Sequence, residues 1–177
     1  MNRIIITGGP GSGKTSLLKA LRNKGMQCFD EIARAVIEEQ QAKKGQKTPW
    51  QDVTGFTELV YENTLAKFDE PISNFAFVDR GLPDNIAYLK HYGGLISTQW
   101  KTFNYFDFYY PTVFLLPAWE AIYEQDPQRL QSYTEAQALH KELVKTYKDL
   151  GFEIIQLQKT TVSKRVTAVI QYTNHLH

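Results

Sequence analysis

Eight residues near the N-terminus combine glycines with a lysine and a threonine at a fixed spacing, G-x-x-x-x-G-K-[ST]. They are Gly8-Gly9-Pro10-Gly11-Ser12-Gly13-Lys14-Thr15. Glycines let consecutive backbone N–H groups turn toward one anion, and a helix beginning here adds the positive end of its dipole. In this pattern Lys14 reaches the β- and γ-phosphates of a nucleoside triphosphate, and the Thr15 hydroxyl binds Mg²⁺. Residues 8–16, which include Ser16, are therefore predicted to form a P-loop, with Lys14 also acting in catalysis.

A second candidate is an aspartate that ends an apolar run. Phe75-Ala76-Phe77-Val78 precedes Asp79 and is typical of a buried strand. Many strands end in an aspartate for structural reasons alone. Beside a P-loop, however, such a carboxylate holds the magnesium shell from the other side. The sequence therefore predicts that Thr15 and Asp79 together hold the Mg²⁺ that accompanies ATP.

The segments expected to position these residues alternate between two kinds of pattern. Apolar runs typical of strands occupy residues 4–6, 26–29, 75–78, 113–116 and 152–157. Helical patterns occupy 14–23, 31–41, a segment opening at the capping box 48–51 and ending before Pro71, one from Pro83, one from the capping box 132–135 to Gly151, and 162–171. Asp30 is placed to cap the second helix. Alternating strands and helices predict an α/β fold with a parallel sheet covered on both faces.

Composition narrows the class of protein. The 177 residues suit one domain, and 42% hydrophobic with 22% charged residues is ordinary for a globular chain. The net charge is +1 without a basic block, so nucleic acid is an unlikely partner. The single cysteine, Cys28, excludes an intrachain disulfide and is expected to be an inert, buried thiol. The N-terminal apolar run is too short for a signal peptide or membrane span, and we expect a cytoplasmic protein.

Histidines and aromatic residues are the other two residue types that could bind a ligand. The four histidines share no ligand spacing, so no metal is expected beyond nucleotide-bound magnesium. The aromatic-rich segment 100–114 could stack on a base or on a ring-bearing acceptor. We favour a role in the core, because aromatic side chains bury a large area.

Several segments together resemble the P-loop kinase-like proteins, and more closely the NadR-type "AAA domain" family of predicted ATPases and kinases, whose namesake relative phosphorylates nicotinamide riboside. The segments are the P-loop, Phe29-Asp30-Glu31-Ile32-Ala33-Arg34, Val78-Asp79-Arg80-Gly81-Leu82-Pro83-Asp84, Pro117-Ala118-Trp119-Glu120 with Asp126 and Arg129, and Gly151-Phe152-Glu153-Ile154-Ile155. The resemblance implies a three-layer P-loop NTPase over residues 1–177, with a five-stranded parallel sheet in order 2-3-1-4-5. It also implies a small helical lid at approximately 118–133.

The resemblance also implies residues on the acceptor side of the site. Asp30 and Glu31 stand where kinases of this type place an acid that accepts the proton of the attacking hydroxyl. Arg34, one helical turn beyond Glu31, is predicted to bind an anionic group of the acceptor. The structural alternatives are that Asp30 only caps the helix and that Glu31 and Arg34 form a surface pair.

Three further residues follow from the same comparison. Arg80 resembles the arginine that clamps an acceptor near the γ-phosphate, and Asp84 is predicted to contact the acceptor with it. Arg129 resembles a lid arginine that neutralises charge on the transferring phosphoryl oxygens. The alternatives are an ion pair between Arg80 and Asp84, and an exposed charge at Arg129.

Two functions remain in competition at this stage. The first is a small-molecule kinase that passes the ATP γ-phosphoryl to a nucleoside- or nucleotide-like acceptor. The second is a regulatory ATPase or a nucleotide-sensing binding protein. An ATPase that activates water requires a further carboxylate or glutamine beside the γ-phosphate, whereas Asp79 is followed by Arg80. This favours the kinase, while the acceptor, the choice between ATP and GTP, and the oligomeric state stay open.

Overall fold

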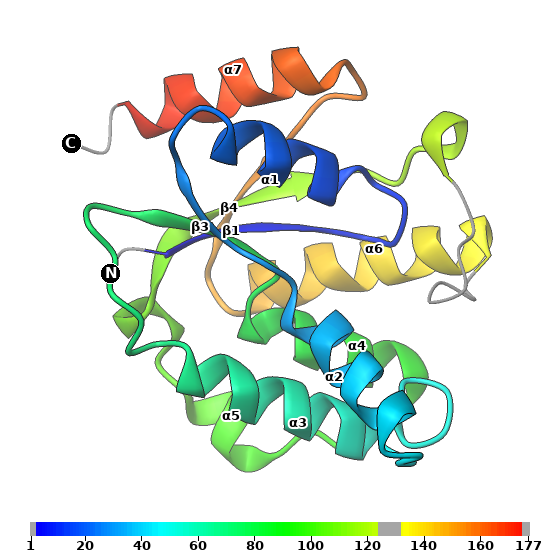
Figure 1. Ribbon diagram of the computed structural model, residues 1–177. Coiled ribbons are helices and arrows are strands. Elements are labelled where there is room, and N and C mark those ends of the chain that lie inside the picture. The colour runs from blue at the N-terminus through cyan, green and yellow to red at the C-terminus, as the bar shows by residue number, and fades with distance from the viewer. Residues whose placement is uncertain (1–2, 124–131, 175–177) are drawn as a thin grey trace.

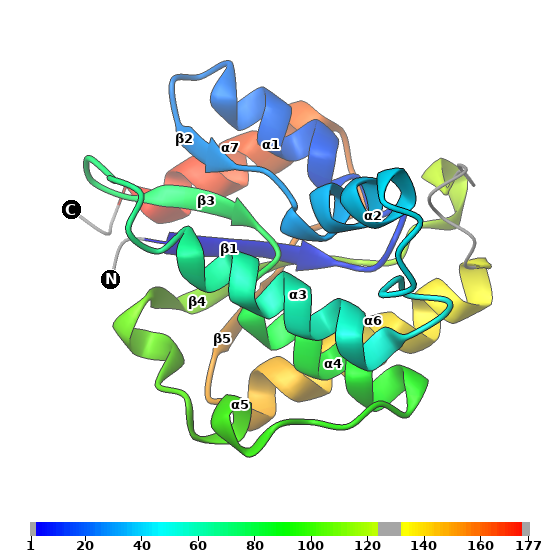
Figure 2. The ribbon, with the colours of Figure 1, turned by 60° about the horizontal axis from the view of Figure 1, so that its bottom comes forward.

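Five parallel strands form the centre of the molecule, in the order β2-β3-β1-β4-β5 (Figure 2). The structure is a computed structural model that describes residues 3–123 and 132–174. The strands are β1 (Arg3–Gly8), β2 (Gln27–Phe29), β3 (Ala76–Asp79), β4 (Tyr109–Leu116) and β5 (Glu153–Gln156). This order confirms the predicted fold class. It places β1 at the centre of the sheet, with β3 beside it, so the P-loop and Asp79 follow neighbouring strands.

Helices cover both faces of this sheet (Figure 1). One face carries α1 (Lys14–Arg22) and α7 (Val162–Thr173), and the other carries α3 (Val53–Ala66), α4 (Leu82–Tyr92), α5 (Thr98–Thr102) and α6 (Tyr133–Asp149). Short 3₁₀ helices lie at Tyr105–Asp107 and Glu120–Ile122. The remaining helix, α2 (Ile32–Ala42), packs on α3 through a small apolar cluster of Val36, Ile37, Phe56 and Val60.

The central strand shows why a continuous apolar run was needed. Successive side chains of a strand point to opposite faces of the sheet. Ile4 and Ile6 therefore pack with α1 and α7, whereas Ile5 packs with α4 and α6. Both faces are buried at these three positions, which explains why all three are apolar.

Two element boundaries differ from the sequence prediction. The helix predicted to open at Pro49 begins at Val53, because the Asp52 carboxylate accepts a hydrogen bond from the Gly55 N–H at 2.9 Å and caps it. Thr48, predicted to cap that helix, donates its hydroxyl to the Gln51 side chain at 2.9 Å. The capping box predicted at Ser132 and Glu135 is confirmed.

The fourth strand also begins earlier than predicted. It starts at Tyr109 rather than Val113, and its register with β1 shifts between Arg3 and Ile5. Pro111 lies within this irregular stretch and is exposed, as expected for a residue that has no N–H to donate. Upstream, Trp100, Tyr105 and Tyr109 are buried in the core, which confirms the structural interpretation of the aromatic segment.

Cys28 lies half-buried in β2, where burial raises the pKa of its thiol to about 11. The thiol is therefore neutral at physiological pH, in keeping with the inert role expected for it.

Within the ranges 3–123 and 132–174, no helix combines the length and the apolar character needed to cross a bilayer.

Candidate active site

The P-loop follows β1 and leads directly into α1, as the motif predicts. Two of its glycines have left-handed backbone angles, with φ of 70° at Gly11 and 90° at Gly13. A Cβ at Gly11 would lie 2.5 Å from the Tyr123 ring, and one at Gly13 would lie 3.1 Å from the Arg165 guanidinium. Both the backbone angle and the close approach therefore require glycine at these two positions.

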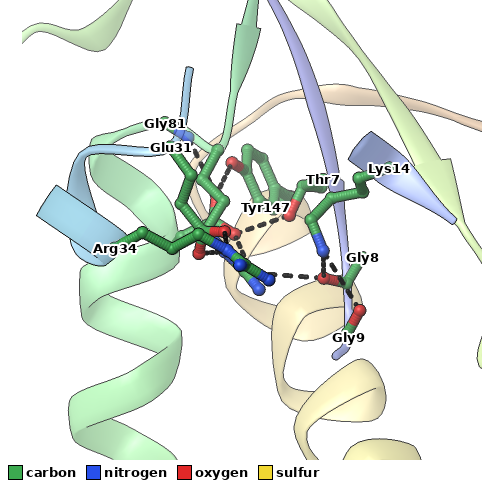
Figure 3. Close-up of polar contacts among 10 residues, drawn as sticks. Thr7, Gly8, Gly9, Lys14, Glu31, Arg34, Gly81 and Tyr147 are labelled. Carbon is green, nitrogen blue, oxygen red and sulfur yellow. Dashed lines mark hydrogen bonds and ion pairs between the residues drawn. The ribbon is translucent and has the colours of Figure 1, made fainter. Parts of the chain in front are cut away.

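Lys14 is folded back onto the loop that precedes it (Figure 3). Its ammonium group donates hydrogen bonds to the carbonyl oxygens of Gly8, at 2.9 Å, and Gly9, at 3.1 Å. Burial, with a smaller contribution from the positive charge of Arg80, lowers the pKa of Lys14 to about 8. An anion bound next to this amine would favour its charged form and reverse that shift.

Asp79 is buried at the end of β3, and its Oδ1 atom has no hydrogen-bond partner among the described residues. Burial raises the pKa of this carboxyl to about 6, against the opposing effect of the Lys14 charge. The buried Ser12 hydroxyl is also unpartnered in the described part of the chain. Polar atoms left unpaired in a buried site are exceptional, and here they face the cavity that the P-loop lines.

This donor set fits magnesium that arrives with a nucleotide. Mg²⁺ in such sites is held by one or two protein oxygens together with phosphate oxygens and water. Asp79 and Thr15, which both line the cavity, supply oxygens of the right kind. The described residues contain no group of three or more His, Cys, Asp or Glu side chains that would hold a metal without a nucleotide.

Arg80 is the centre of a polar network beside the P-loop, in which Figure 3 labels Glu31 and Gly8. Its Nε donates to Glu31 Oε1 at 2.6 Å, and its Nη1 donates to Gly8 O and Asp84 Oδ1, each at 3.2 Å. The backbone of Arg80 has φ of 69°, which is rare for a residue with a side chain. Strained backbone of this kind persists where surrounding contacts hold it, and often at functional sites.

Asp84 is the second carboxylate in the network around Arg80. It is buried, and it accepts hydrogen bonds from the Thr7 hydroxyl at 2.6 Å, the Gly81 N–H at 3.0 Å and the Tyr147 hydroxyl at 2.5 Å, besides the one from Arg80. Both carboxylate oxygens are thus engaged by protein donors. The sequence interpretation missed Thr7 and Tyr147, and Tyr147 lies 63 positions from Asp84 without any local signal.

The structure separates the two adjacent acids after β2. Glu31 faces Arg80, and although burial is the largest single effect and opposes ionisation, the charges of Arg80 and Lys14 and the hydrogen bond from Arg80 together lower the pKa of Glu31 to about 2. Asp30 points away, with 86% of its side chain exposed, and pairs with Arg22 at 2.8 Å. The prediction that Asp30 caps α2 is wrong, because the N-cap residue is Glu31, which makes no side-chain cap bond.

The remaining predicted residues lie at the edge of this site or outside the description. Arg34 forms the i,i+3 ion pair with Glu31 that was the structural alternative, with Nε 3.6 Å from Oε2. Arg129, together with residues 124–131 of the predicted lid, lies outside the described residues.

Arg165, on α7, contacts the P-loop and was not found from the sequence. Its Nη1 donates to Ser12 O and its Nε to Gln158 O, both at 2.9 Å, and its guanidinium carbon lies 5.2 Å from the centre of the Trp119 ring. The side chain is buried, and Nη2 has no partner among the described residues. Because Ser12 and Arg165 are 153 positions apart, no spacing pattern could have connected them.

One cavity of about 860 Å³ joins these groups. The P-loop, Asp79 and the Glu31–Arg80 pair line one part of it. The rest extends between α2, α3 and α4, where its walls include Phe29, Ile37, Phe56, Val60, Val78 and Tyr88. This volume lies within the range of about 300–1,000 Å³ that is usual for small-molecule sites.

The P-loop after the central strand of a 2-3-1-4-5 sheet defines a P-loop kinase-like NTPase. Residues 3–165 match the sequence profile of a family described as "AAA domain", and the chain belongs to this family.

Solved structures of kinases share its fold. Deoxyadenosine kinase from M. mycoides, solved with dCMP and a flexible dCDP bound, is similar with a TM-score of 0.71 and 18% identity, over 99% of this chain and 100% of that one. Shikimate kinase from Aquifex aeolicus gives 0.56 and 17%, covering 98% of each chain. Shikimate kinase from Acinetobacter baumannii, in complex with shikimate, gives 0.58 and 15%, over 99% of this chain and 94% of that one. No curated protein matches the sequence at a significant level.

Proposed function

We propose that this protein is an ATP-dependent kinase that transfers the γ-phosphoryl group to a hydroxyl of a nucleoside- or nucleotide-like acceptor. The observation that carries the proposal is that Glu31 and Arg80 line the same cavity as the P-loop, with Arg80 bound both to Glu31 and to the Gly8 carbonyl. That arrangement leaves room for an acceptor between a phosphate-binding loop and a carboxylate. The named kinases that share the fold support the same class of reaction.

On the nucleotide side, the roles follow the geometry of the loop. The backbone N–H groups of the loop that follows Pro10 bind the phosphates, and Lys14 turns from the Gly8 and Gly9 carbonyls to the β- and γ-phosphates. Thr15 and Asp79 would hold Mg²⁺, which neutralises negative charge on the phosphates when it is bound. Arg165 braces the loop through the Ser12 carbonyl and does not need to touch the nucleotide.

On the acceptor side, Glu31 orients the hydroxyl and receives its proton. The acceptor oxygen forms a bond to the γ-phosphorus, the bond from that phosphorus to the β,γ-bridging oxygen breaks, and ADP leaves. The low pKa of Glu31 makes it a weak base. In a loose transition state the hydroxyl proton leaves late, so orientation by the carboxylate contributes more than basicity.

Arg80 is the cation nearest to Glu31. We propose that it stabilises the negative charge that spreads over the oxygens of the phosphoryl group during transfer. Asp84 was predicted to contact the acceptor, but its oxygens already accept four hydrogen bonds. We therefore assign Asp84 to positioning Arg80. Roles for Arg34 in acceptor binding and for Arg129 in the lid remain predictions.

The direct test measures phosphoryl transfer and phosphate release side by side. The purified protein is given Mg-ATP and, separately, Mg-GTP with a panel of nucleosides, their monophosphates, nicotinamide riboside and shikimate. A kinase transfers phosphate to one class of acceptor and hydrolyses little without it. Slow hydrolysis that no acceptor changes would instead support a regulatory NTPase and would overturn the proposal.

A further inference from the structure

The acceptor end of the cavity is walled by three helices and by the edges of two strands. Apolar side chains dominate there: Phe29 and Val78 come from the sheet, Ile37 from α2, and Phe56 and Val60 from α3. Such walls suit the flat face of a ring. These apolar walls do not indicate whether the acceptor is charged or neutral.

The charged side chains that line the cavity bear on the charge of the acceptor. Arg3, at the far end, donates twice to the Lys67 and Phe68 carbonyls, and Lys67 is paired with Glu70. Arg34 and Arg80 are both paired with Glu31. Within the ranges 3–123 and 132–174 these cations are all paired, so an anionic acceptor would have to displace one of these contacts.

Asn85 in the same wall differs from these paired cations. Asn85, on α4, is 7% exposed and lines the cavity. No hydrogen bond between described residues engages its side-chain amide. An amide that lines a cavity offers two N–H donors and one carbonyl acceptor to a ligand there. Tyr88 lies one turn further along α4 in the same wall.

Resting on the proposed kinase function, we propose that Asn85 determines acceptor specificity by reading the edge of an uncharged planar ring. The ring must present adjacent hydrogen-bond donor and acceptor atoms, as the edge of a nucleobase does. Pairing with an amide then takes the two-point form in which asparagine recognises such edges. The acceptor is thus a nucleoside-like alcohol, whereas a phosphate monoester would bind only if one of the paired cations left its partner.

The test measures binding without turnover, by calorimetry in the presence of Mg²⁺ and a non-hydrolysable ATP analogue. The probes are adenosine, inosine, purine riboside, which lacks the exocyclic group at the ring edge, and adenosine 5′-monophosphate. In the wild type, loss of the edge group should weaken binding about 10–100-fold. In Asn85→Leu that difference should shrink to about 3-fold or less, because the partner of the edge is gone.

Two further variants serve as a control and as a fallback for Asn85→Leu. Thr57→Val is the matched control, since its hydroxyl lines the same cavity but donates to the Val53 carbonyl of its own helix at 2.8 Å. It should leave the ranking of probes unchanged. Asn85→Asp keeps the size of the side chain if the leucine variant fails to fold. Its carboxylate only accepts, so it should shift preference from inosine toward adenosine, whose edge carries an amino group.

The outcomes separate this inference from the kinase proposal. Ring-edge selectivity that survives in both Asn85 variants overturns the inference, as does tighter binding of the monophosphate than of every nucleoside, or binding of no probe at all. Asn85-dependent binding without any phosphoryl transfer overturns the kinase proposal and leaves the binding assignment standing. Phosphoryl transfer with the same acceptor preference in the wild type and in the Asn85 variants overturns this inference and leaves the kinase proposal standing.

Discussion

The two sides of the cavity are built in different ways. The phosphate side is made largely of consecutive residues, 10–16, whose backbone is expected to form the anion cradle. The acceptor side is a network of side chains from separate elements, with Thr7 on β1, Glu31 before α2, Arg80 after β3 and Tyr147 on α6. A cradle of backbone groups keeps its hydrogen-bond donors when many of its side chains are substituted. A network of side chains loses contacts when any one of its members is substituted.

The comparison predicts that the largest single effect lies on the phosphate side, at its one indispensable side chain. Lys14→Ala should lower kcat/KM by about 10³-fold or more and weaken triphosphate binding, because the loop then lacks the ammonium group expected to bind the β- and γ-phosphates. Calorimetry with ATP and a transfer assay measure both. The control is Lys19→Ala, an exposed lysine on the same helix. Unchanged ATP affinity in a folded Lys14→Ala protein would contradict the assignment.

On the acceptor side, the adjacent acids provide a matched pair. Glu31→Gln should reduce phosphoryl transfer by about 10²–10³-fold, because the attacking hydroxyl loses the group that orients it and takes its proton. Asp30→Asn should change transfer by less than about 3-fold, since that side chain faces solvent and Arg22. ATP affinity should stay the same in both. Equal rates in the two variants would show that neither acid takes part.

Asp79→Asn separates function from stability. Activity at limiting magnesium should fall about 10–100-fold, because a neutral amide is a poorer ligand for Mg²⁺, and titration of the rate against magnesium shows it. The nucleotide-free protein should nevertheless become more stable at pH 7, by about 1–3 kcal/mol, since burial raises the pKa of Asp79 to about 6 and its ionised form is disfavoured in the fold.

The pH dependence checks the sign of this effect. Between about pH 4 and pH 6 the folded wild type binds a proton at Asp79 that the unfolded chain has released, so its stability falls as pH rises through that window. The Asn variant lacks this slope. Denaturant unfolding at pH 4 and pH 7 should therefore show a gain at pH 7 and almost none at pH 4. A constant difference at both pH values would place the cause elsewhere.

The smallest effect is expected at the edge of the network. Tyr147→Phe removes one of four hydrogen bonds to Asp84 and should lower transfer by about 3–10-fold, with a loss of about 1–3 kcal/mol in unfolding free energy. Tyr105→Phe also removes a buried hydroxyl, one that donates to the Trp100 carbonyl at 2.6 Å away from the site. It should lose stability without losing activity. The same activity loss in both would reduce Tyr147 to a general packing role.

The same division explains how far sequence reasoning reached. The P-loop, the apolar strands and the Ser132–Glu135 capping box were predicted because each depends on residues close together in the chain. The helix start at Val53 was misplaced because two local capping patterns compete there, and only the folded chain shows that Asp52 prevails. The resemblance supplied the strand order, which no local pattern contains.

For the site, the sequence by itself determined which chemistry was available: a phosphate loop, an aspartate after the neighbouring strand, and acids and arginines nearby. Only the tertiary structure decided that Glu31 rather than Asp30 faces Arg80, that Asp84 is held by Thr7 and Tyr147, and that Arg165 supports the P-loop. The physical reason is range. Backbone conformation and capping are fixed by neighbours along the chain, whereas burial and ion pairing depend on side chains brought together by packing.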